Sequence, residues 1–127
     1  MTWSQLDTQA RAFRVAHALF AVGQLTGLGY VWLCALTGRR DRLLDGSVGG
    51  LALEGVALVV GRGDCPMGPF QRSLGDPVPM FEWVLPPRAA KAAIPVLTAV
   101  AVAGLLALLV RRPSGRTADA GVPGRRC

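Results

Sequence analysis

The sequence predicts an all-α membrane protein, with three transmembrane helices and a proline-rich interfacial or re-entrant loop between helices two and three. Hydrophobic residues make up 51% of the 127-residue chain, and they gather in three long segments. Six of the nine prolines fall instead between the second and third of these segments. Because about 20 helical residues cross a hydrocarbon layer of ~30 Å, each segment approaches or exceeds the length of a span. A soluble fold of this size has too little interior to bury all three.

The first span is expected at residues 12–37, after a short polar lead at residues 1–11. A soluble helix of this length would carry a continuous polar stripe, and this segment has none. Arg14 lies near its start, and Arg39 and Arg40 lie just past its end; the clearly polar side chains between them are His17, Gln24 and Thr26.

The second and third spans are expected at residues 44–61 and 89–110. The second is short, and it holds Asp45 at its start and Glu54 near its middle. The third carries no charge beyond Lys91 and is the most uniformly apolar. Together with the first span they define a membrane domain at residues 12–110.

The loop at residues 62–88 interrupts the apolar pattern with prolines and turn-forming dipeptides. Within it, the segment PMFEWVL at residues 79–85 is apolar and aromatic but too short to span. We therefore expect an interfacial or re-entrant piece, with Phe81 and Trp83 at the membrane surface.

Basic residues lie beside the apolar segments, mainly at residues 39–42 and 111–126, and give a net charge of +6. They do not alternate with aromatic residues as in a nucleic-acid-binding face, so no nucleic acid is expected as a partner. With the N-terminus outside, the cytoplasmic side would hold eight Lys and Arg and the outer side six. This asymmetry favours a plasma-membrane protein with a cytoplasmic, disordered basic tail at residues 111–127. The richness in Arg, Ala, Gly and Pro suggests a bacterial source.

Glycines spaced four residues apart occur in both of the first two spans. Gly23 and Gly27 form one such pair, and Gly46 and Gly50 form another. Small residues at this spacing let membrane helices approach closely. They predict packing between the first two helices, or against a membrane-protein partner or a second copy of the chain.

Three polar residues within the spans are predicted to form an intramembrane cluster: His17, Gln24 and Glu54. A charged side chain within a bilayer is costly, so Glu54 is expected to face the bundle interior and meet a partner. At ~1.5 Å per residue, His17 and Glu54 fall at similar depths in antiparallel helices. The cluster could be a proton relay, a ligand pocket or a metal site, or a neutral Glu54 could bond to His17 as packing.

The second candidate site is Cys65 with Pro66, in the loop. A Cys-Pro pair can hold haem iron through its thiolate, and a thiol near Arg62 could be reactive. Against this, Asp64 opposes a lowered thiol pKa, and such pairs are common by chance. No Cys-x-x-C pair, phosphate loop or hydrolase motif is present, so no cofactor, metal or enzymatic activity is predicted.

Several short motifs carry a family resemblance: His17-Ala-Leu-Phe20, Glu54, Cys65-Pro66 and Phe81-Glu82-Trp83-Val84-Leu85. In this order they resemble a family of small bacterial integral membrane proteins of unknown function. Here Met67 stands where that family has Leu, and Trp83 stands near the place of a second His. The resemblance implies a membrane topology and no activity.

Together these patterns predict a small, non-enzymatic binding or accessory component of a membrane complex. It would bind its partner through the glycine-lined helix faces. The alternative is an intramembrane ligand, proton or redox site, haem or metal, built on His17, Glu54 and Cys65.

Overall fold

The structure, a computed structural model, describes residues 3–63 and 65–111. Its elements are the 3₁₀ turn η1 (Trp3–Gln5), the helices α1 (Thr8–Thr37), α2 (Arg42–Val60) and α3 (Met67–Ser73), the 3₁₀ turn η2 (Met80–Trp83) and the helix α4 (Pro87–Val110). These described residues contain no strand, and α1, α2 and α4 are long and apolar enough to span a membrane. The predicted fold class is confirmed. Asp64 and the predicted tail beyond Arg111 lie outside the described residues.

The three long helices begin at residues 8, 42 and 87, a few residues before the predicted starts at 12, 44 and 89. Capping side chains explain the first two differences. Asp7 accepts a hydrogen bond from the backbone N–H of Thr8 at 2.8 Å, and Asp41 accepts one from that of Leu44 at 2.9 Å. The third helix begins with Pro87, whose fixed φ suits a first helical position.

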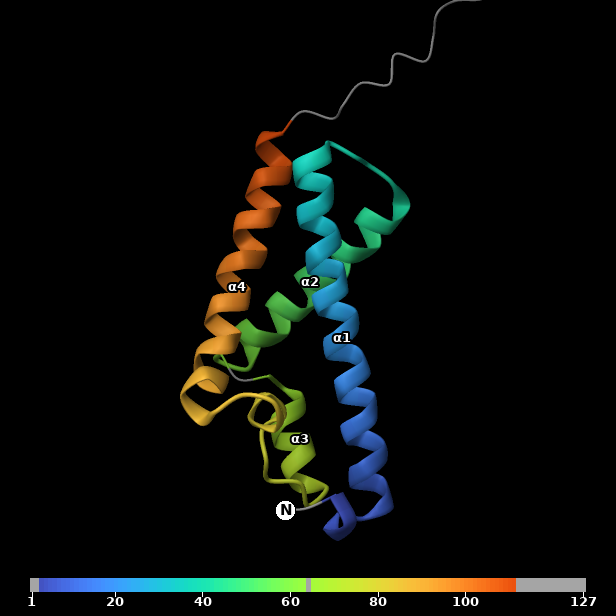
Figure 1. Cartoon of the computed structure of the whole chain (residues 1–127), viewed down its shortest axis with the longest axis vertical. Coiled ribbons are helices and arrows are strands. Elements are labelled where there is room, and N and C mark those ends of the chain that lie inside the picture. Colours follow the sequence, from blue (N-terminus) through green and yellow to red (C-terminus); the bar gives the residue numbers. More distant parts are fainter. Residues whose placement is uncertain (1–2, 64, 112–127) are drawn as a thin grey trace, which may run out of the picture.

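The long helices α1 and α4 pack side by side, while α2 crosses obliquely (Figure 1). Helix α1 has 30 residues, about 45 Å, and therefore exceeds a ~30 Å hydrocarbon layer by roughly ten residues. Its N-terminal part extends beyond α4, and there α3 and the loop around η2 lie against it (Figure 1). The loop therefore forms a cap at one end of the bundle.

The main core lies at the opposite end, around Val31 and Cys34, whose side chains are fully buried. Gly104 of α4 faces this core, where a Cβ atom would lie 3.0 Å from Nε1 of Trp32 and 3.3 Å from Cγ1 of Val31. The indole of Trp32 also donates to the carbonyl oxygen of Val100 at 3.2 Å. The absence of a side chain at Gly104 therefore allows α1 and α4 to approach closely.

Most other large apolar side chains point outward. Leu53, Val59 and Leu109 are 71%, 79% and 82% exposed. Such broad apolar exposure is expected where lipid is the solvent. The three apolar helices thus indicate a multi-pass membrane protein.

The turn between α1 and α2 is organised by Asp41. Gly38 ends α1 in the left-handed region, with φ of 73°. Asp41 then accepts hydrogen bonds from the Tyr30 hydroxyl at 2.5 Å and from Nε of Arg39 at 3.0 Å. The hydrogen bond from Tyr30, followed by that from the N–H of Leu44, lowers the pKa of Asp41.

Two of the four glycines singled out by their spacing lie at the contact between α1 and α2. A Cβ atom at Gly27 would lie 3.6 Å from the Ser47 side chain, and one at Gly50 would lie 3.6 Å from Oε1 of Gln24. At Gly23 and Gly46 a Cβ atom would meet open space.

Candidate functional site

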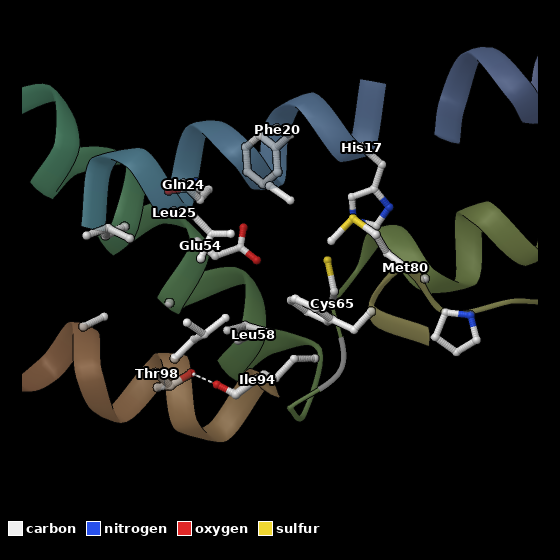
Figure 2. Close-up of a pocket in the computed structure, with 18 of the residues that line it drawn as sticks. His17, Phe20, Gln24, Leu25, Glu54, Leu58, Cys65, Met80, Ile94 and Thr98 are labelled. Carbon is white, nitrogen blue, oxygen red and sulfur yellow. Dashed lines mark hydrogen bonds between the residues drawn. The ribbon is translucent and has the colours of Figure 1, made fainter. Parts of the chain in front are cut away.

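A cavity of about 400 Å³ lies between α1, α2 and α4 and is bordered by the loop from Cys65 to Phe81 (Figure 2). Most of its lining is apolar. All three residues of the predicted intramembrane cluster, His17, Gln24 and Glu54, line it, and so does Cys65. The structure thus brings the two predicted sites together into one cavity.

The imidazole of His17 is buried, and its Nδ1 lies 3.3 Å from Oε1 of Gln71. The Gln71 amide nitrogen donates to Asp76 at 3.0 Å and to the Val78 carbonyl oxygen at 2.7 Å. Since the amide oxygen can only accept, this arrangement assigns the proton to Nδ1 and makes Nε2 of a neutral ring an acceptor. The hydrogen bond of His17 therefore goes to Gln71 rather than to Glu54.

The cap is held on α1 by an ion pair between Arg14 and Asp76. Nε and Nη2 of Arg14 donate to the two carboxylate oxygens at 2.8 and 2.5 Å. The Asp76 side chain is fully buried and that of Arg14 is 11% exposed. The guanidinium also lies 4.3 Å from the ring centroid of Trp83. Burial alone would raise the pKa of Asp76, but the hydrogen bonds from Arg14 and the Val78 N–H outweigh it and lower that pKa.

Sequence reasoning missed this pair and the helix that supports it. Asp76 belongs to the turn-forming Gly-Asp-Pro stretch of the loop, which by itself gives no sign of a partner, whereas Arg14 near the start of an apolar segment signals the need for an anion. Helix α3 was not predicted, since Pro69 falls inside it. A proline is tolerated there because first-turn N–H groups have no intrahelical partner.

The aromatic residues of the loop lie against other parts of the fold. Phe81 lines the cavity and Trp83 is half-buried against Arg14. Val84, which follows η2, is 86% exposed. The predicted position of Phe81 and Trp83 at the membrane surface stays a prediction.

Gln24 joins α1 to α2, because its side-chain amide donates to the carbonyl oxygen of Gly50 at 3.2 Å. It therefore serves helix packing as well as lining the cavity.

Glu54 is half-buried, and its carboxylate lies toward the cavity interior (Figure 2). Within residues 3–63 and 65–111, neither ion pair includes Glu54, and it makes no hydrogen bond through its side chain. It lies six residues before the end of α2, about 9 Å along the helix. An unpaired acid is thus placed inside a largely apolar cavity.

The Cys65 thiol is half-buried at the same cavity, beside Pro66 at the start of α3. Burial raises the pKa of this thiol and outweighs the hydrogen bond from the Met67 N–H, which lowers it; the nearby Glu54 carboxylate adds a smaller rise, and the Gly68 N–H a still smaller fall. Cys65 is therefore mostly a protonated thiol at neutral pH, and it reacts with thiol reagents through a small thiolate fraction that grows as the pH rises. In the described part of the chain, no three His, Cys, Asp or Glu side chains are grouped so that they could hold a metal ion.

No family model, curated protein or solved structure matches this chain. The resemblance to a family of small bacterial membrane proteins stays a prediction.

Proposed function

We propose that this protein is a non-enzymatic binding protein of the membrane, whose cavity holds a small amphiphilic molecule. The observation that carries this proposal is the cavity of about 400 Å³ between the three long helices, with an apolar lining and a few polar groups. Small-molecule sites in proteins commonly have volumes of ~300–1,000 Å³ and this kind of lining.

The lining suits a molecule with a polar head and an apolar body. The polar groups His17, Glu54 and Cys65 lie near the loop. Leu28 and Leu105 line the part between the helices, with Leu28 about 16 Å along α1 from His17. The head would lie beside the loop, and the body would extend between the helices.

The finer placement in the cell is also part of the proposal. We place the protein in the plasma membrane of a bacterium, with its N-terminus and loop outside and its C-terminus in the cytoplasm, from the distribution of basic residues. The cavity would then take up its ligand from the outer side. The predicted association with a membrane partner through the glycine faces stays a prediction; Gly23 and Gly46 leave open space there.

Alkylation of Cys65 tests whether the cavity is occupied. The protein in phosphatidylcholine nanodiscs is treated with N-ethylmaleimide, and the modification of Cys65 is followed by peptide mass spectrometry. Dodecyltrimethylammonium and neutral dodecyldimethylamine oxide are the probes. At least one of them is expected to slow the modification in a saturable manner.

The variant Gly55→Leu fills the cavity, since Gly55 lines it and a Cβ atom there meets no atom within 4 Å. Any protection that either probe gives the wild type is expected to be lost in this variant. Gly29→Leu is the matched control, because Gly29 also faces open space but does not line the cavity. If neither probe protects the wild type, or if Gly55→Leu is protected as well as Gly29→Leu, the proposed function is wrong.

A further inference from the structure

The negative charge of Glu54 inside the cavity indicates which class of ligand the cavity binds. Glu54 projects into the cavity from α2, between helices that face lipid, and it has no ion-pair partner in the part of the chain that the structure describes. A carboxylate in such surroundings is stabilised when a positive group approaches it. Among residues 3–63 and 65–111, the bundle brings no such group to Glu54.

The other titratable groups around the cavity are already engaged or solvated. On α1, His17 bonds to Gln71, and in the loop the charge of Asp76 is matched by Arg14. Arg72 of α3 lines the loop end, but it is exposed, so water and salt screen its charge. The residues of α4 that line the cavity are uncharged. Glu54 therefore contributes the one unmatched, half-buried charge among the described lining residues.

Aromatic rings in the lining also favour a cationic ligand. Phe20 of α1 and Phe81 of η2 both line the cavity. The faces of such rings attract organic cations, in particular quaternary ammonium groups that are weakly hydrated. An anionic head would be repelled by Glu54, and a neutral one would leave the carboxylate unpaired.

We propose that the cavity binds a lipophilic organic cation, an amphiphile whose protonated or quaternary amine pairs with Glu54 while its apolar body lies between the three long helices. This inference rests on the proposed function and adds the charge of the ligand. The cation would provide the positive group that the described residues do not supply.

The same Cys65 assay tests it, with the two probes compared at equal chain length. Dodecyltrimethylammonium and dodecyldimethylamine oxide differ chiefly in the replacement of one methyl group by oxygen, which removes the net charge. In the wild type the cation is expected to give half-maximal protection at a concentration about tenfold lower than the amine oxide, the scale of one partly solvated ion pair.

Glu54→Gln retains size and removes the charge, so the two probes are expected to protect it at similar concentrations. Asp45→Asn is the matched control, because it removes an exposed carboxylate of the same helix outside this cavity and should keep the preference. Because Glu54 also influences the Cys65 thiol, the ratio between the two probes is compared and not the labelling rate itself.

The possible results separate the two proposals. Equal protection of the wild type by both probes would overturn the cation inference and leave the amphiphile-binding function standing. A cation preference that persists in Glu54→Gln would overturn the role of Glu54. Absence of protection by either probe would overturn both.

Discussion

Removal of the Asp76 charge should detach the loop from α1. In Asp76→Asn the side chain keeps its size, but Arg14 loses the anion that it contacts at 2.8 and 2.5 Å. Breaking a buried pair by removing one partner costs about 3–5 kcal/mol. Because Arg14 is 11% exposed and also contacts Trp83, part of that penalty is relieved. We expect a local destabilisation of about 2–3 kcal/mol.

Amide hydrogen exchange in nanodiscs measures this opening directly. A cost of about 2–3 kcal/mol corresponds to an increase in exchange of roughly 30- to 150-fold for amides that exchange by local opening. The increase should appear in peptides covering residues 67–85. Peptides around Val31 and Leu108 at the other end of the bundle should not change, and Asp45→Asn should leave every peptide unaffected.

A second variant tests whether the destabilisation comes from leaving the Arg14 charge buried without a partner or from losing the contact itself. The double variant Arg14→Met/Asp76→Leu replaces the pair by apolar side chains, and its loop is expected to exchange much less than that of Asp76→Asn, because no buried charge is left alone. If Asp76→Asn exchanges like the wild type, the ion pair does not hold the cap and this reasoning is refuted.

The pH dependence of amide exchange in the loop should reflect the protonation of Asp76 in its ion pair with Arg14. The pKa of Asp76 in the folded protein lies below its ordinary value, which is about 3.9. The stabilisation is therefore fully present above that ordinary value and is lost as the pH falls through the lower, folded-state pKa. Exchange in residues 67–85, corrected for its intrinsic pH dependence, should rise only below about pH 4. In Asp76→Asn this rise should be absent.

Two further variants test the other end of the bundle. Gly104→Leu should separate α1 from α4, because even its Cβ atom would lie 3.0 Å from Trp32 Nε1. We expect the free energy of unfolding, measured by thermal unfolding, to fall by about 1–3 kcal/mol. A variant as stable as Gly29→Leu, whose side chain would face open space, would contradict this. Tyr30→Phe removes the hydrogen bond that most lowers the pKa of Asp41. That pKa should rise toward its ordinary value, so the stability of the variant should fall less steeply on acidification than that of the wild type. Superimposable stability–pH curves would refute this assignment.

The sequence by itself determined the fold class and singled out four residues that line the cavity, His17, Gln24, Glu54 and Cys65. Hydropathy is a property of contiguous residues, and a run of about 20 apolar positions is constrained to cross lipid as a helix wherever its neighbours lie. The same local reasoning singled out His17 and Glu54, because polar side chains are conspicuous in such runs. It misjudged helix starts by two to four residues, since the effect of a capping Asp or an initial Pro was not weighed.

Only the tertiary structure decided which polar groups meet. Arg14 and Asp76 are 62 positions apart and His17 and Gln71 are 54 apart, so no local pattern records that they touch. The close contact at Gly104 is likewise a property of two packed helices, not of the helix that contains it. Spans follow from the free energy of transferring a segment into lipid, whereas partners follow from how the segments pack. Among the residues that the structure describes, that packing leaves Glu54 without an ion-pair partner beside a cavity.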